Sequence, residues 1–150
     1  MRKILIIVTI LILSGCTNYH LNIDEFRKTS LNEGYYLDNE NREYKNYDYV
    51  QDICYAYNRE KDYLVQFIKL KDDDYAYRFF LTNQEAFNQE KNKYTYFKEQ
   101  NTSNYNLYHI ESEKYYMLLI RMDNSVIYVN TDIKYKSDIE NLLENLKLNY

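Results

Sequence analysis

Three consecutive aspartates, Asp72-Asp73-Asp74, form the densest group of potential metal ligands in the sequence. Clustered carboxylates suit Ca²⁺, and the twelve-residue window of an EF-hand loop would run from Asp74 to Glu85. Several positions of this window lack the oxygen ligands and the glycine that such a loop needs: they hold Ala76, Arg78 and Phe79. The aspartates are better explained as a helix start, where carboxylates favour the positive end of the helix dipole. We therefore expect no metal site here.

The two histidines, His20 and His109, lie far apart in the sequence, and neither belongs to a metal-binding spacing such as HExxH. His109 lies inside an expected strand, where a structural or surface role is the commoner one. No serine has a GxSxG or SxxK context. With Gly34 as the one glycine after position 15, a glycine-rich phosphate loop is excluded.

Glu111 and Glu113 flank an expected hairpin and could pair as a general acid and a general base. Solvated turn carboxylates are the commoner explanation of such a pair. We therefore assign no catalytic residue, no metal ligand and no cofactor-binding residue from these motifs.

The first sixteen residues have the order of a secretory signal. Met1-Arg2-Lys3 is basic, residues 4–13 are apolar apart from Thr9, and Leu13-Ser14-Gly15-Cys16 follows. The apolar run is shorter than the roughly 20 residues that a helix needs to cross a bilayer. A permanent membrane span is therefore not expected.

Residues Leu13 to Cys16 resemble the lipobox of bacterial lipoproteins. This resemblance implies that Cys16 receives a diacylglycerol and fatty acyl chains such as palmitate, and that residues 1–15 are removed as a signal peptide. It also implies a lipid-anchored protein on the extracytoplasmic face of the cell membrane. The alternatives are an ordinary signal peptide with an incidental cysteine, or a cytosolic protein with a buried first strand.

Removal of residues 1–15 would leave 135 residues, a usual length for one domain. Arg2 and Lys3 would leave with the leader, so 17 basic residues would face 23 acidic ones, a formal charge of −6. An acidic chain gains nothing from phosphate attraction, so a nucleic-acid partner is not expected. It also lacks a polybasic patch for anionic lipid, so the lipid on Cys16 would have to hold the protein at the membrane.

Cys54 would then be the one cysteine left, without an intrachain disulfide partner. It lies in an expected strand, which favours a buried, inert thiol. The chain also has 20 tyrosines and no tryptophan or proline. Tyrosine suits contacts with carbohydrate or protein, but its scatter over every segment agrees better with compositional bias.

The first half of the chain predicts a helix, three strands and a second helical region. Asn22 and Glu25 form a capping box, Ile23, Phe26 and Leu31 give an apolar face, and Gly34 ends the helix. Strands are expected at 35–37, 50–57 and 63–70, with an exposed loop over 38–48. An apolar stripe then indicates a helix after Asp72, with a possible second capping box at Thr82 and Glu85 and a bend at Leu81: it comprises Tyr75, Ala76, Phe79, Phe80 and Phe87.

The second half predicts a meander of strands at 105–111, 114–122 and 125–131, with Asp123-Asn124 as a hairpin turn. Both faces of the middle strand are apolar, which suits a strand covered on both sides or one face padded by tyrosine. Ser137 and Glu140 form a capping box for the last helix. Its apolar residues recur at helical spacing: Ile139, Leu142, Leu143 and Leu146.

These elements predict an α+β fold, a mainly antiparallel sheet of about five or six strands with three or so helices packed on one face. We expect residues 16–22 to be the lipidated N-terminus and a short tether, and residues 23–150 to be one domain. Each half is a strand meander closed by a helix, which suggests a duplicated unit.

The sequence favours a lipid-anchored binding protein rather than an enzyme. It would contact an envelope protein or glycan through a sheet face or the Asp38–Asp48 loop. The alternatives are an envelope-acting hydrolase, whose carboxylates must converge in a pocket, and a protective lipoprotein that intercepts a lytic enzyme or a toxin.

Overall fold

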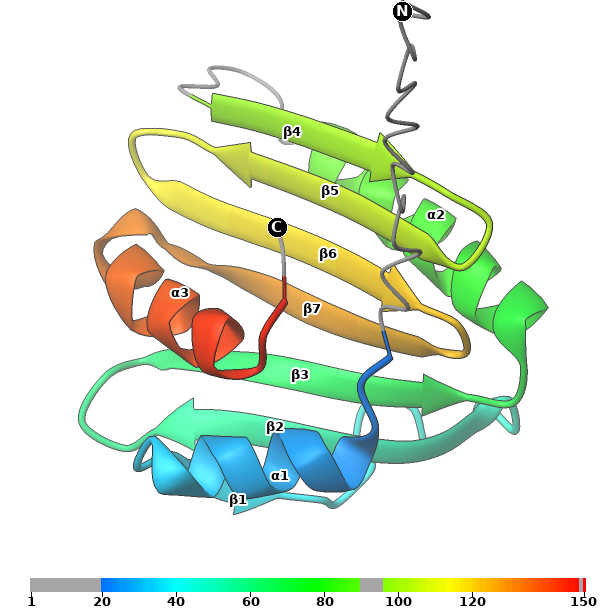
Figure 1. Cartoon of the computed structure of the whole chain (residues 1–150), viewed down its shortest axis with the longest axis horizontal. Coiled ribbons are helices and arrows are strands. Elements are labelled where there is room, and N and C mark those ends of the chain that lie inside the picture. The colour runs from blue at the N-terminus through cyan, green and yellow to red at the C-terminus, as the bar shows by residue number, and fades with distance from the viewer. Residues whose placement is uncertain (1–19, 90–95, 149) are drawn as a thin grey trace, which may run out of the picture.

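The computed structural model describes residues 20–89, 96–148 and 150, which form one antiparallel sheet with helices on both faces (Figure 1). Cys16 and residues 1–15, the expected signal peptide, lie outside these residues. The sheet has seven strands in the order β1-β2-β3-β7-β6-β5-β4. Its strands are β1 (Tyr36–Asp38), β2 (Val50–Asn58), β3 (Tyr63–Leu70), β4 (Tyr96–Asn101), β5 (Tyr105–Glu111), β6 (Tyr115–Met122) and β7 (Ser125–Asp132). The α+β class and the antiparallel sheet are thus confirmed.

Two helices cover one face of the sheet and a third covers the other (Figure 1). Helices α1 (Ile23–Asn32) and α3 (Lys136–Asn145) share a face, and α2 (Asp73–Gln89) lies behind the sheet. The expectation that all helices pack on one face is therefore wrong. The central strands are apolar on both faces, so each face needs a cover to exclude water.

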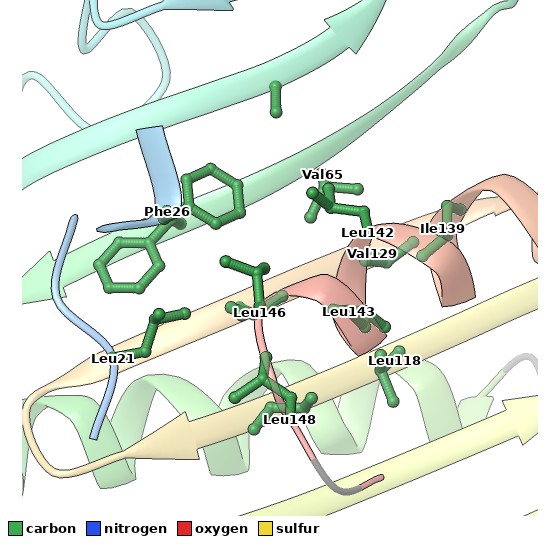
Figure 2. Packing of buried hydrophobic residues seen from close by; sticks show 14 of the residues in the cluster. Leu21, Phe26, Val65, Leu118, Val129, Ile139, Leu142, Leu143, Leu146 and Leu148 are labelled. Atoms are coloured by element: carbon green, nitrogen blue, oxygen red, sulfur yellow. The ribbon is translucent and has the colours of Figure 1, made fainter. Parts of the chain in front are cut away.

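The core under α1 and α3 joins both helices to the sheet (Figure 2). Phe26 of α1 is fully buried beside Phe67 of β3, with the ring centroids 5.3 Å apart. Leu21 is 3% exposed and packs in this core, although residues 16–22 are expected to form a tether. The packed part of the chain therefore begins before α1.

The core under α2 uses the opposite side chains of the same strands. Ala76, Phe80 and Phe87 of α2 meet Ile68, Leu119 and Val126 of the sheet. In β6, Leu118 and Ile120 belong to the first core, whereas Met117 and Leu119 belong to the second. The apolar character of both faces of β6 is thus explained by cover on both sides.

Helix α1 begins and ends as its sequence predicts. The Asn22 side chain accepts a hydrogen bond from the Glu25 backbone N–H at 2.8 Å. At the other end, Gly34 has a φ of +82°, and the Tyr35 N–H donates to the Ser30 carbonyl at 2.9 Å, which forms a Schellman motif. Leu31, expected on the inner face, is instead 57% exposed.

The expected internal caps of the other two helices are absent. Helix α2 runs unbroken past Leu81, with the Asp72 carboxylate accepting from the Tyr75 N–H at 3.0 Å. Before α3 lies a 3₁₀ turn (Ile133–Tyr135), capped by the Asp132 side chain. The helix begins at Lys136 with no side-chain cap, so the Thr82 and Ser137 capping boxes are wrong. In both places the preceding chain is already helical, and no free N-terminus is left to cap.

Strand β4 has no counterpart among the expected strands. It pairs with β5 at the edge of the sheet, and its residues alternate between exposed and half-buried positions. An edge strand with so little burial carries no alternation of apolar and polar residues. Because that alternation is what predicts a strand from the sequence, β4 was not expected.

The structure does not have the symmetry of a duplicated unit. Strands β3 and β7 are antiparallel neighbours at the junction of the two halves, so a two-fold axis relating the halves would be perpendicular to the sheet. Such an axis keeps α2 and α3 on the same face, and they lie on opposite faces.

No helix in the described part of the chain is long and apolar enough to span a bilayer.

Replacement of Gly34 tests the end of α1. A Cβ at this position meets no atom within 4 Å, so the cost of Gly34→Ala is conformational. We expect the free energy of unfolding to fall by about 1 kcal/mol, and by less for Gly34→Asn, because asparagine tolerates positive φ better. Urea denaturation of the three proteins measures this order. Equal stability of all three would contradict the left-handed cap.

Candidate functional site

An aromatic cavity of about 410 Å³ lies where the loop before β2 meets α2. We call it the aromatic cradle. Its lining residues are Tyr44, Tyr47, Tyr49, Tyr75, Arg78, Phe79, Thr82 and Asn83. A concave surface with aromatic walls and a few polar groups is the usual form of a small-ligand site.

Local turns place the loop tyrosines on the same wall. The Tyr44 N–H donates to the Asn41 side chain at 2.9 Å, and the Tyr47 N–H donates to the Tyr44 carbonyl at 2.9 Å. The Lys71 N–H then fixes the Tyr49 carbonyl at 2.8 Å, next to the start of α2. The end of the loop is therefore fixed two residues before α2 begins, which places its tyrosines beside the helix.

Helix α2 supplies the opposite wall. Tyr75, Phe79 and Asn83 are four residues apart from one to the next, so they share one helix face. In the sequence, Tyr75 and Phe79 belong to the apolar stripe that includes Ala76 and Phe80. The structure divides this stripe: Ala76 and Phe80 are buried in the core, whereas Tyr75 and Phe79 are half-buried and line the cradle.

The rings form a continuous apolar surface. Tyr49 and Tyr75 are stacked, with centroids 5.2 Å apart and planes 11° from parallel. The ring centroids of Tyr47 and Tyr49 are 5.3 Å apart, and the Tyr44 ring makes an edge contact with the Phe79 ring at a centroid distance of 5.6 Å. Contacts of this kind add about 0.5–1.5 kcal/mol each beyond area burial, so the rings stabilise one another without a ligand.

The cradle carries little net charge. Its one charged lining residue is Arg78, whose guanidinium lies 2.6 Å from the Asp74 carboxylate. Burial raises the pKa of Tyr44, so its hydroxyl stays neutral. The Asn83 amide nitrogen donates to the Phe79 carbonyl at 2.8 Å, which leaves its side-chain oxygen as an acceptor. The arrangement suits a neutral ligand with hydroxyl or amide groups.

The three aspartates have separate structural roles. Asp72 caps α2, Asp74 pairs with Arg78, and Asp73 lines a second cavity, between α2 and the β4–β5 hairpin. In the residues that the structure describes, no three His, Cys, Asp or Glu side chains gather as a metal site.

A recess of about 200 Å³ beside β1 and β2 brings together Asp38, Glu40 and Glu43. Arg42 also lines the recess, with Nη2 2.6 Å from the Glu40 carboxylate and 3.2 Å from the Asp38 carboxylate. Two of the three acids are thus neutralised by a guanidinium. We therefore assign this recess to ion pairing rather than to acid–base catalysis.

Cys54 is fully buried, and burial raises the pKa of its thiol to about 11. The expectation of a buried thiol is confirmed. His20 is exposed, and its Nδ1 lies 3.5 Å from the Asp123 carboxylate. Glu113 is exposed and stands apart from Glu111.

Glu111 instead belongs to a group of three titratable side chains, of which Glu111 and His109 are buried and Lys136 is partly exposed. Lys136 Nζ lies 2.8 and 2.9 Å from the two Glu111 carboxylate oxygens. His109 Nε2 lies 3.2 Å from Glu111 Oε1, although their orientation makes no hydrogen bond. Burial lowers the pKa of His109 to about 4. Lys136 comes from α3, so no pattern within β5 indicates this group.

This buried group has the composition of a proton-transfer site but not the access. The His109 side chain is 4% exposed and the Glu111 side chain 11%. Tyr96 and Tyr116 close around the imidazole, with ring centroids 5.0 and 4.8 Å away. We therefore assign it to stability rather than to catalysis.

The lowered pKa of His109 makes stability depend on pH. The unfolded imidazole binds a proton near pH 6.5 and the folded one near pH 4, so stability falls as the pH drops through this interval. His109→Phe removes this dependence and keeps an aromatic ring. Between pH 7 and pH 4.5, we expect the variant to lose about 2–3 kcal/mol less than the wild type. Urea denaturation at both pH values measures the difference, and equal losses would contradict the assignment.

Comparison of the chain with protein-family models, with curated proteins and with solved structures finds no match.

Proposed function

We propose that this chain is a lipid-anchored extracytoplasmic binding protein that holds a neutral segment of an envelope glycan in the aromatic cradle. The observation that carries the proposal is the stacked pair of Tyr49 and Tyr75 on the wall of a cavity with almost no free charge. Flat aromatic surfaces pack well against the apolar faces of sugar rings. The Asn83 oxygen, the Thr82 hydroxyl and the Arg78 guanidinium lie where sugar hydroxyls would need partners.

A glycan fits the cradle better than a folded protein does. Protein partners are usually held over a broad surface, with about 800 Å² buried on each side. The cradle is instead a small, half-open cavity of about 410 Å³, within the range of sites for small ligands. The loop expected to make the contact supplies Tyr44 and Tyr47.

The proposed anchor agrees with this ligand. Four residues separate Cys16 from Leu21, the first residue that packs in the core. Even fully extended, this segment spans less than about 20 Å. A lipid on Cys16 would therefore keep the domain close to the bilayer, among the polymers of the envelope.

The cradle is tested with the protein from residue 17 onward, using purified cell-wall sacculi in a sedimentation assay and soluble N-acetylglucosamine oligomers in calorimetry. We expect Tyr49→Ala and Tyr75→Ala each to weaken binding by about tenfold, or about 1.4 kcal/mol. Tyr115→Ala is the matched control, because Tyr115 is 47% exposed and lies outside the cradle.

Binding that the two cradle variants leave unchanged would refute the site. Release of soluble sugars from the sacculi would identify a hydrolase instead. Absence of glycan binding together with capture of a lytic enzyme or toxin would identify a protective protein.

The anchor is tested by Cys16→Ala in intact cells. We expect the variant to leave the membrane fraction or to accumulate as the unprocessed precursor. Cys54→Ala is the control, since its buried thiol takes no part in anchoring. Labelled palmitate should enter the wild type and Cys54→Ala but not Cys16→Ala. Absence of label from the wild type would refute the lipoprotein proposal.

A further inference from the structure

A second cavity contains a buried arginine that forms no ion pair. Arg121 of β6 is 3% exposed. Its hydrogen-bond acceptors are all neutral: Nε donates to Asn106 Oδ1 at 2.5 Å, and the terminal nitrogens donate to the carbonyls of Asp123 and Ser103 at 3.1 and 2.8 Å. Among the described residues, no carboxylate lies within the 4.0 Å of a salt bridge with it.

This arrangement is costly unless the remaining donors are used. A guanidinium has five N–H groups in a planar fork that matches a carboxylate. The three bonds to Asn106, Asp123 and Ser103 leave one N–H on each terminal nitrogen. A buried cation is normally paired with an anion, because desolvation disfavours the charged form. Burial does lower the pKa of Arg121.

The cavity beside Arg121 has a volume of about 450 Å³. Its walls are Asp73, Asp74 and Tyr77 of α2, and residues 101–103 and Asn106 of the β4–β5 hairpin. Asp74 is paired with Arg78. Asp73 is exposed and forms no ion pair in the described part of the chain. The Asp73 carboxylate, which forms no ion pair, thus lines the same cavity as Arg121, whose two remaining N–H groups have no acceptor. The two side chains attract each other over a distance longer than a salt bridge.

We propose that this cavity binds a small zwitterion with a carboxylate and an ammonium group, either a free amino acid or a short peptide. The carboxylate contacts the free N–H groups of Arg121, and the ammonium contacts Asp73. Tyr77, whose ring centroid lies 5.6 Å from the Arg121 guanidinium carbon, flanks the ligand. The proposal does not depend on the glycan site, which uses a different cavity.

The charge pattern selects this class over a simple anion. Two aspartates at the cavity wall repel a phosphate or a second carboxylate. An ammonium group on the ligand converts the repulsion from Asp73 into attraction. The hydrogen bonds from Arg121 to Ser103 and Asp123 also join two hairpin turns, but that structural role leaves the two remaining N–H groups and the free Asp73 unexplained.

Four probes separate the two charge contacts by calorimetry: alanine, alanylalanine, N-acetyl-alanylalanine and alanylalanine amide. We expect the zwitterionic dipeptide to bind at least tenfold more tightly than either blocked dipeptide. Comparison of alanine with alanylalanine distinguishes a free amino acid from a peptide. Equal binding of the zwitterion and the blocked forms, or no heat with any probe at millimolar concentration, would overturn the proposal.

Asp73→Asn should weaken alanylalanine at least tenfold and should not weaken N-acetyl-alanylalanine, because the acetylated probe has no ammonium group to lose a partner. The loss of a repelling carboxylate should instead tighten the binding of this anionic probe. The matched control is Asp62→Asn, in the β2–β3 loop. Arg121→Lys should weaken both probes, and thermal denaturation checks that this variant folds. If Arg121→Lys does not fold, Asp73→Asn still decides, since it changes an exposed side chain. Equal weakening of both probes by Asp73→Asn would contradict the ammonium contact.

Discussion

The central strands of the sheet are apolar on both faces, and both faces must be shielded from water. Leu118 and Ile120 of β6 face one way, and Met117 and Leu119 face the other. Each of the four residues is at most 5% exposed. No single layer of helices can exclude water from both sides. The chain therefore places α1 and α3 on one face and α2 on the other.

This two-sided cover also determines where cavities can form. Within the described residues, the middle of the sheet offers no free face to a ligand, because β3, β6 and β7 are covered by helices. The cradle and the Arg121 cavity instead both lie along the N-terminal part of α2, one against the loop before β2 and the other against the β4–β5 hairpin. The first turns of α2 serve both sites: Tyr75 and Arg78 line one, and Asp73 and Tyr77 line the other.

Tyrosine has two structural uses in this chain. Tyr105, Tyr108 and Tyr116 are at most 1% exposed and act as large core residues, and the Tyr108 hydroxyl donates to the Asn88 side chain. Tyr47, at 47% exposed, presents its ring to solvent in the cradle. A composition rich in tyrosine is thus compatible both with a bias of the sequence and with a binding site. Only the position of each ring distinguishes the two.

Features that depend on neighbouring residues could be predicted from the amino-acid sequence. The bounds of β3 and β5, the Asn22 cap and the Gly34 stop of α1, and the turn at Asp123, whose φ is +48°, all follow from local periodicity and backbone preference. The lipobox resemblance is equally local. Sequence reasoning failed where the same local pattern fits two environments, as with Tyr75 and Ala76 in one helical stripe.

Contacts between groups that are distant in the chain could not be predicted in this way, because they depend on the folding of the whole chain. Glu111 and Lys136 are 25 residues apart. The loop tyrosines meet α2 because β2 and β3 pair antiparallel, which brings the start of β2 beside the end of β3. The side of the sheet that each helix covers is decided by the sum of apolar contacts over the whole fold, and no single segment contains that sum. The same is true of Asp73 and Arg121, which belong to different elements and face each other across one cavity.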